Sequence, residues 1–298
     1  PLPILLKASH RGPRAGKQTQ GRVMGQAAKV VVLLCSLSVR GSLSQQAPPA
    51  DDVHCEAASR DDRVVSTADE ALMLTADLER CSGLEFNVLW QGSIGINQPL
   101  ILSNSTTLRM TGESKETSVV DGGGESTLFN VSDFSELYLE GLTFTGGFGD
   151  DGGAVAIWSG AAVTLEDCVF EGNTATSNGG AVYLQGGSSL AAGGVDFIGN
   201  GAEVCGGAIH AGDESIVTTM DGTVNTFVGN SARDGGAIHA QEGSDVTFGS
   251  GGKVTISGNS ALFEGGAMHL ERSCVMRTGG VTLFAGNEAV DSGGGVWA

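Results

Sequence analysis

A regularly spaced set of aromatic and imidazole side chains is the strongest candidate for chemistry in this sequence. The set lies four residues after the first glycine of successive Gly-Gly pairs and runs through Ala156, Tyr183, His210, His239, His269 and Trp297. If these positions alternate along short strands, the side chains point outward on a flat face. Stacked imidazoles could bind a transition metal or gain protons together near pH 6, and the aromatic rings could stack on a sugar. Exposed strand positions also favour large flat side chains without any ligand, so both interpretations stay open.

Acidic residues recur just before the same glycine pairs. They are Asp150, Asp151, Asp234, Glu264 and Asp291, and Asn178 and Cys205 take the equivalent place in two repeats. Carboxylates of adjacent repeats could coordinate calcium. The GGxGxD pattern of calcium-binding repeats is absent from the sequence, and solvated acidic turns explain the residues equally well. No cofactor is therefore predicted, and calcium is the open alternative.

The sequence offers no convincing catalytic set. Glycoside hydrolysis needs two carboxylates across one bond, and a lyase needs a base beside a neutralised substrate carboxylate. From Phe144 to Ala298 the basic residues are Arg233, Lys253, Arg272 and Arg277. None has a companion acid cluster at a repeated offset. The chain is therefore predicted not to be an enzyme, and a polysaccharide lyase, hydrolase or epimerase is the alternative.

The glycine pairs belong to a repeat of 27 to 30 residues. The pairs start at Gly152, Gly179, Gly206, Gly235, Gly265 and Gly293. An asparagine column keeps the same interval at Asn173, Asn200, Asn230, Asn259 and Asn287. A phenylalanine column accompanies it at Phe144, Phe170, Phe197, Phe227 and Phe284, with Ile256 once in its place. Since a leucine-rich repeat would require LxxLxL before the asparagine, it does not fit.

Stacking explains these columns. If each repeat is one coil of a solenoid, equivalent residues lie about 4.8 Å apart. The phenylalanines then form an apolar ladder, and each asparagine amide bonds to those above and below. The glycine pairs supply positive φ and close approach at a corner. The sequence therefore predicts an all-β, single-stranded parallel β-helix.

The coils extend upstream in a less regular form. Short strands are expected at 99–102, 107–110, 118–122, 128–131, 137–139 and 142–144. A capping helix is expected over about 66–80, with Ser66 or Thr67 as its N-cap and Asp69 or Glu70 in the capping-box position. The apolar residues expected to cover the first coil are Ala68, Ala71, Leu72 and Leu78. The β-helix is thus predicted for 86–298, with regular coils from 144, and the N-terminal cap for 48–85.

Charge and an apolar segment point to export. Residues before Asp51 include seven of the 16 basic residues and no acid, which leaves 34 acids against nine bases and a formal charge near −25 afterwards. Such a surface repels nucleic acid and favours cations or basic partners, although it also serves solubility. Residues 24–47 have the pattern of a signal peptide cleaved after Ala47, preceded by an unstructured extension over 1–23. The protein is therefore predicted to be secreted or on the cell surface.

The cysteines of the exported part are Cys55, Cys81, Cys168, Cys205 and Cys274. Because no CxxC pair occurs among them, a cysteine zinc site is not favoured. Cys55 and Cys81 flank one short helical segment and are the best candidates for a disulfide. The sequons at Asn104 and Asn130 are candidate glycosylation sites, to be used only in a eukaryotic secretory route.

The motif columns resemble the passenger domains of the polymorphic outer membrane proteins, which carry repeated GGA[ILV] and FxxN motifs. GGAV stands at 152–155 and 179–182, and GGAI at 206–209 and 235–238. Departures are GGAM at 265, GGGV at 293 and the isoleucine in the phenylalanine column. The resemblance spans Phe144 to the end, and the upstream coils are similar to the pectin-lyase-like right-handed β-helix superfamily.

The resemblance implies a right-handed coil and a surface-exposed, non-enzymatic adhesin. Its partner would be a cell-surface protein or glycan. Family passengers are exported through a C-terminal barrel, and this chain ends within a coil at Ala298. Membrane association is therefore expected only through a region after Ala298, and the outer membrane is the expected location if a barrel follows.

Overall fold

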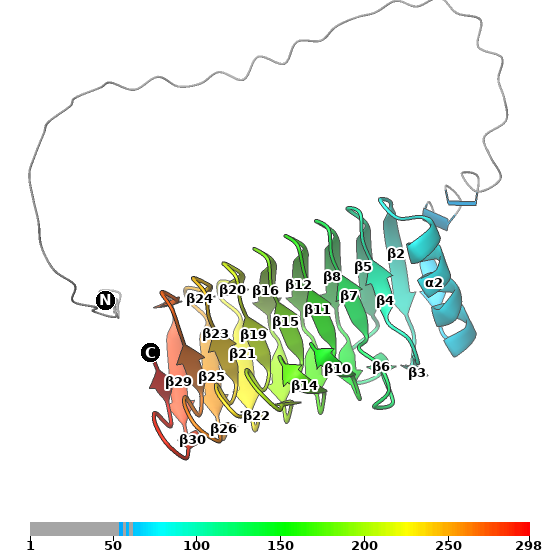
Figure 1. The fold of residues 1–298 in the computed structure, drawn as a ribbon. Helices are drawn as coiled ribbons and strands as arrows, with labels where there is room; N and C mark the ends of the chain where they lie inside the picture. The colour runs from blue at the N-terminus through cyan, green and yellow to red at the C-terminus, as the bar shows by residue number, and fades with distance from the viewer. Residues whose placement is uncertain (1–53, 56–57, 60–61) are drawn as a thin grey trace, which may run out of the picture.

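The protein is an elongated parallel β-solenoid, seen here in a computed structural model that describes residues 54–55, 58–59 and 62–298 (Figure 1). The expected signal peptide and the extension before it lie outside the described residues. Within 62–298 the strands wind through about nine turns and form four sheets, in which each strand pairs in parallel with its counterpart one coil away. This confirms the predicted β-helix, while its right-handed sense stays a prediction.

Sheet A begins each coil and carries alternating inward and outward side chains. Its strands are β1 (Arg63–Val65), β2 (Glu85–Trp90), β5 (Thr107–Gly112), β8 (Glu136–Glu140), β12 (Ala162–Glu166), β16 (Ser189–Gly193), β20 (Ile216–Thr219), β24 (Asp245–Phe248) and β28 (Val275–Thr278).

Sheet B follows in each coil and contains the phenylalanine column. Its strands are β3 (Ser93–Gly95), β6 (Val119–Asp121), β9 (Thr143–Thr145), β13 (Val169–Glu171), β17 (Asp196–Ile198), β21 (Val224–Val228), β25 (Lys253–Ser257) and β29 (Val281–Ala285).

Sheet D contains short strands at the next corner, beside the asparagine turn. Its strands are β10 (Phe148–Asp151), β14 (Thr174–Asn178), β18 (Gly201–Ala202), β22 (Ser231–Ala232), β26 (Ser260–Ala261) and β30 (Glu288–Ala289).

Sheet C completes the coil after the glycine pair. Its strands are β4 (Leu100–Leu102), β7 (Phe129–Val131), β11 (Val155–Ile157), β15 (Val182–Leu184), β19 (Ile209–Ala211), β23 (Ile238–Ala240), β27 (Met268–Leu270) and β31 (Val296–Trp297).

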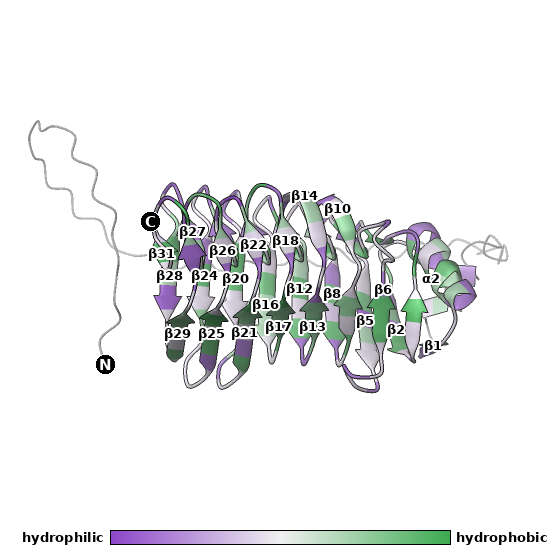
Figure 2. Cartoon of the chain, turned by 90° about the horizontal axis from the view of Figure 1, so that it is seen from below, coloured by the Kyte–Doolittle hydropathy of each residue, from purple (hydrophilic) through white to green (hydrophobic). Residues whose placement is uncertain are grey.

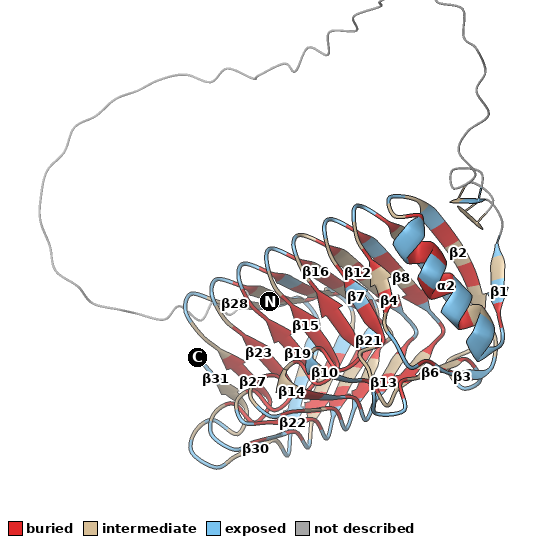
Figure 3. Cartoon of the chain, turned by 45° about the vertical axis from the view of Figure 1, so that its right-hand side comes forward, coloured by how far each residue is buried: buried red, intermediate tan, exposed pale blue. Residues whose placement is uncertain are grey.

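The phenylalanine ladder is the apolar spine of the solenoid. Phe144, Phe170, Phe197 and Phe227 are buried, and consecutive rings stack at centroid distances of 4.8, 5.2 and 4.8 Å. Ile256 continues the column in register with Phe227. Hydrophobic positions recur from coil to coil along the long axis (Figure 2), and buried positions recur in each coil in the same way (Figure 3). The last member of the column, Phe284, is 37% exposed at the end of the described solenoid.

The asparagine ladder forms continuous hydrogen bonds between coils. Asn200 donates from Nδ2 to Oδ1 of Asn230 at 3.0 Å and to the carbonyl oxygen of Phe170 at 2.9 Å. Its backbone N–H also donates to Oδ1 of Asn230, at 2.9 Å. The same three bonds recur at the adjacent rungs of Asn173, Asn230 and Asn259. Each amide therefore joins two coils and satisfies backbone groups of the turn, as predicted.

The glycine pairs form the corner between sheets D and C. Gly206 has φ of +70°, in the left-handed region that favours glycine. A Cβ on the next residue, Gly207, would lie 2.2 Å from the carbonyl oxygen of Gly236 in the following coil. The pair thus combines a turn conformation with a close contact between successive corners.

The N-terminal helix α2 (Ala68–Arg80) lies across the end of the solenoid, where it contacts β4 and β1 (Figures 1 and 3). Thr67 is its N-cap and forms a capping box with Glu70, and a disulfide joins Cys55 to Cys81 after the last turn. These features agree with the sequence predictions. The predicted contact face was wrong in part, because Leu72 is 52% exposed whereas Leu74 is fully buried.

One further detail of the helix differs from the sequence prediction. Ala68 is exposed, while Ala71 and Leu78 pack into the core as predicted. In the part of the chain that the structure describes, no helix has the length and apolar character needed to cross a bilayer.

The asparagine ladder yields a stability prediction. Replacing Asn230→Leu keeps a side chain of similar size but leaves the backbone N–H of Asn200 and the carbonyl of Phe197 without their side-chain partner, and it removes one of the two bonds of Asn200 Nδ2. Because buried unpaired groups cost about 1–3 kcal/mol each, we expect a loss of roughly 3 kcal/mol or more in unfolding free energy. Urea unfolding followed by circular dichroism measures it.

The matched control is Asn287→Leu, at a partly buried rung of the same ladder. Its effect should be smaller, because solvent can reach the groups left unpaired. Equal losses in the two variants would contradict the role assigned to burial of the ladder.

Candidate functional site

The ring column predicted from the sequence is present on sheet C. Tyr183 pairs in register with His210, His210 with His239, His239 with His269, and His269 with Trp297. These residues sit in the middle of β15, β19, β23 and β27 and at the end of β31. Their strand neighbours on either side, such as Val182 and Leu184, belong to the apolar core. The rings therefore occupy the opposite face of the sheet.

The expectation that this column is exposed was wrong. Tyr183 is 6% exposed, His210 2%, His239 0% and His269 4%, whereas Trp297 retains 38%. Each inner ring contacts the ring of the adjacent coil. Side chains from the turn before the glycine pair and from the position two residues after the ring also lie against the column. Sheet C is thus covered on both faces.

The rings do not share one orientation. Tyr183 and His210 are 10° from parallel, as are His210 and His239, but His239 and His269 meet edge to face at 89°. Trp158 extends the column at the other end, with its ring 4.8 Å from that of Tyr183. Sequence reasoning missed Trp158, although it follows Ala156 by two residues and so lies on the same strand face.

Burial keeps the imidazoles of His210 and His239 uncharged. It lowers the pKa of His210 to about 3, and the neighbouring His239 contributes to the shift. Burial also lowers the pKa of His239 to about 4, helped by His269 and partly opposed by Glu271. Nδ1 of all three histidines and Nε2 of His239 have no hydrogen-bond partner among the described residues. Unpaired buried nitrogens of this kind are uncommon and call for an explanation.

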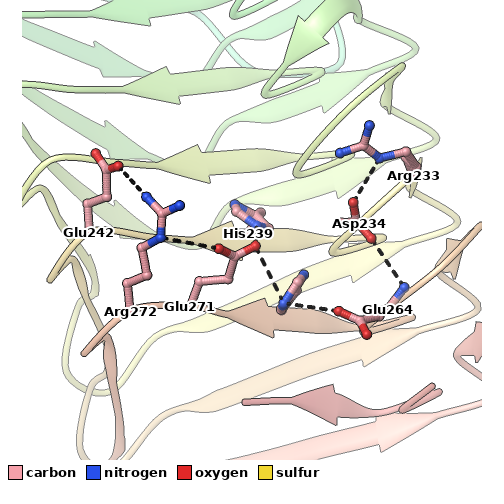
Figure 4. Close-up of polar contacts among 8 residues, drawn as sticks. Arg233, Asp234, His239, Glu242, Glu264, Glu271 and Arg272 are labelled. Atoms are coloured by element: carbon pink, nitrogen blue, oxygen red, sulfur yellow. Dashed lines mark hydrogen bonds and ion pairs between the residues drawn. The ribbon is translucent and has the colours of Figure 1, made fainter.

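Carboxylates approach this column at its C-terminal rungs. Oε1 of Glu271 lies 3.5 Å from Nε2 of His239 and 3.7 Å from Nε2 of His269. Oε2 of Glu264 lies 3.6 Å from Nε2 of His269. Figure 4 shows His239 between Glu271 on one side and Asp234 with Glu264 on the other. Sequence reasoning missed Glu271, although it too follows a ring residue by two positions.

The acids before the glycine pairs form a second, shorter column. Asp151 pairs in register with Asn178. Cys205 forms isolated parallel β-bridges, which are backbone contacts, with both Asn178 and Asp234. Oδ1 of Asp151 accepts from Nδ2 of Asn178 at 2.9 Å, and Asp234 accepts from Nε of Arg233 at 2.9 Å. These carboxylates therefore support the turns. Calcium binding by the column stays a prediction.

A hollow of about 470 Å³ beside sheets A and B brings a base close to acids. Nζ of Lys115 lies 2.9 Å from Oδ1 of Asp167 and 3.6 Å from Oδ2 of Asp196, and Glu140 and Glu166 also line the hollow. The hydrogen bond to Asp167 raises the pKa of Lys115, with Asp196 adding to the effect against partial burial. Lys115 is consequently a charged partner of these acids rather than a base.

Two basic residues of the regular coils form ion pairs with single acids. Arg272 lies 2.8 Å from Glu242, and Arg277 lies 2.8 Å from Asp245. The two acids belong to the preceding coil, so spacing within a coil does not reveal the pairs. All four side chains are at least one-third exposed, so these ion pairs contribute little to stability.

The glycosylation candidates Asn104 and Asn130 are both exposed. Asn104 adopts φ of +55° in the turn after β4. Asn130 lies in β7, in register with Ala156 and hence in the same column as the rings. Their modification stays a prediction.

A comparison with protein families finds the Chlamydia polymorphic membrane protein repeat at residues 167–185 and 226–241. The matched segments include Phe170 with Asn173 and Phe227 with Asn230, each followed by its glycine pair. The chain therefore contains this repeat, within a parallel β-solenoid. No curated protein and no solved structure matches the chain.

The buried imidazoles predict a dependence of stability on pH. The unfolded chain takes up a proton at His210 near the usual pKa of about 6.5, while the folded chain resists it until about pH 3. The stability that the neutral imidazole of His210 contributes to the folded state is therefore fully present above pH 6.5. It is lost as the pH falls toward 3. In His210→Phe, which keeps a stacked ring, the slope of unfolding free energy against pH should decrease by up to about 1.4 kcal/mol per unit.

Chemical unfolding at several pH values between about 4 and 7, in the presence of a chelator, measures this slope. Tyr183→Phe is the control, because it keeps the ring and changes no group that titrates in this range. An unchanged slope in His210→Phe would contradict the assignment of a neutral imidazole to the folded state.

Proposed function

We propose that the chain is a rigid, non-catalytic binding module of an exported surface protein, and that its lateral faces contact a cell-surface protein or glycan. The observation that carries the proposal is the occurrence of the polymorphic membrane protein repeat within a continuous β-solenoid. That family is one of membrane proteins, which supports a location at the cell surface. The disulfide between Cys55 and Cys81 supports an oxidising compartment.

The architecture suits binding over an extended area. Register is kept from β2 through β28 in sheet A and from β3 through β29 in sheet B. Outward positions of each strand consequently form straight columns along the solenoid. Such repetitive surfaces serve as binding faces in other solenoid proteins. A flat, rigid face also loses little conformational entropy when a partner binds.

Charge restricts the partner. The residues from Asp51 onward carry 34 acids against nine bases. The resulting field repels polyanions and attracts neutral or basic surfaces, with a strength that falls as salt rises. We therefore infer a neutral glycan or a protein with a basic patch, and no nucleic acid.

A carbohydrate-active enzyme is the second candidate. The hollow that contains Lys115, Glu140, Glu166 and Asp167 is the observation in its favour, since it brings acids and a base together beside two parallel sheets. Against it stands the ion pair of Lys115 with Asp167, which holds the base protonated. The binding module is therefore the better supported function.

Incubation of the purified chain with immobilised neutral and acidic polysaccharides and with cultured cells separates the two functions. A binding module should be retained by cells or a neutral glycan, with weaker retention at high salt, and should release no reducing or unsaturated ends. Polysaccharide turnover that disappears in Lys115→Met or Glu166→Gln would overturn the proposal. Arg109→Met, which removes an exposed base of sheet A outside the hollow, is the matched control.

A further inference from the structure

The rung between His239 and His269 is built differently from the two rungs before it. Between Tyr183 and His239 the rings stack nearly parallel, and parallel rings keep equivalent nitrogens a full strand spacing apart. His269 instead stands at 89° to His239, with a centroid distance of 4.9 Å. The Nε2 atoms of these two histidines can thus point to the same place, next to Oε1 of Glu271.

The distances at this rung are too long for good hydrogen bonds and suit a shared ion. Oε1 of Glu271 is 3.5 Å from one Nε2 atom and 3.7 Å from the other, and Glu264 is 3.6 Å from Nε2 of His269. Zinc binds histidine and carboxylate ligands at about 2.0–2.2 Å, so two ligand atoms of a tetrahedral site are separated by roughly 3.4 Å. The ligand atoms of His239, His269 and Glu271 all lie within 4.8 Å of one another.

Burial and charge at this rung are also consistent with a cation. His239 is fully buried, and neither of its ring nitrogens has a partner among the described residues. Coordination would give one of them a partner. Glu264 and Glu271 together carry two negative charges, which balance a divalent ion. Arg272 is 4.0 Å from Oε2 of Glu271, leaving Oε1 toward the histidines.

We propose that His239, His269 and Glu271 bind one divalent transition metal ion of the zinc class, and that Glu264, which lies against His269, adds negative charge beside the ion. Two imidazoles and a carboxylate are a ligand set that suits zinc, nickel and related ions. The ion joins β23 to β27, and so links two coils by contacts additional to the strand hydrogen bonds. Glu271 and Glu264, each about one-third exposed, give the ion access from solvent.

A neighbouring set shares His239 but is less suitable. Cys205 and His210 also place ligand atoms within 4.8 Å of His239. His210 and His239 are stacked at 10°, which prevents their nitrogens from converging on one ion. Burial raises the pKa of Cys205 to about 12, helped by Asp234, so its thiol is poorly prepared to become a thiolate ligand.

Zinc titration of the chelator-stripped full chain tests the proposal. We expect zinc to raise the midpoint of thermal unfolding by several degrees, because binding stabilises the folded state. His269→Phe keeps an aromatic ring in a column that already holds Tyr183 and Trp297, and Glu271→Gln changes a partly exposed side chain. In both variants zinc should no longer raise the midpoint of thermal unfolding. Their affinity for zinc, measured by equilibrium dialysis, should be at least tenfold weaker.

Two controls define the site. Cys205→Ser removes a ligand of the competing set, and Glu242→Gln removes the partner of Arg272 without touching the proposed ligands. Both should keep the increase, and cobalt bound in place of zinc should show no thiolate charge-transfer absorption. The proposal is overturned if zinc does not stabilise the unmodified chain, if the increase persists in Glu271→Gln, or if it is lost in Cys205→Ser.

Discussion

The spacing of parallel strands, about 4.8 Å from one coil to the next, is the constraint on which the structure depends. Backbone hydrogen bonds fix it in every sheet, so each side chain must tolerate a similar one directly above and below. Phenylalanine meets this condition by ring stacking at 4.8 to 5.2 Å. Asparagine meets it because one amide both donates and accepts. The repeated residues are those that can stack on themselves.

The same spacing penalises a column of like charges. The stacked imidazoles of His210 and His239, 5.0 Å apart, cannot both be protonated without strong repulsion, and burial adds a desolvation cost, so these two histidines are held neutral. The turn acids avoid the problem differently, because Asn178 and Cys205 interrupt the column and Arg233 pairs with Asp234. At the rung of His239 and His269 the two rings are edge to face rather than parallel. Their Nε2 atoms therefore both lie close to the carboxylate of Glu271.

Sequence alone predicted what depends on repetition. The asparagine and phenylalanine ladders, the glycine corners and the helix cap at Thr67 all follow from residue type and interval. Burial of His239 could not be predicted in the same way, because its cover comes from neighbouring rings and from the turn before the glycine pair. The contact of Glu271 with the histidines could have been predicted from the sequence, since Glu271 lies two residues beyond His269 on the same strand face. The buried side of α2 depended on how the helix packs, and Leu74 rather than Leu72 faces the solenoid.

The glycine corners carry a consequence for how such a chain can change its length. The second glycine of one pair touches the carbonyl of the next pair's second glycine, as Gly207 does with Gly236. Adding or deleting one whole repeat restores the same contact between new neighbours, and every ladder remains in register. Small length differences are absorbed in the turn before the corner, because the stretch from Asn230 to Gly235 is one residue shorter than that from Asn200 to Gly206, yet Gly236 approaches Gly266 as closely as Gly207 approaches Gly236. A chain of this kind can therefore change its overall length by complete repeats while the line of glycine corners is kept.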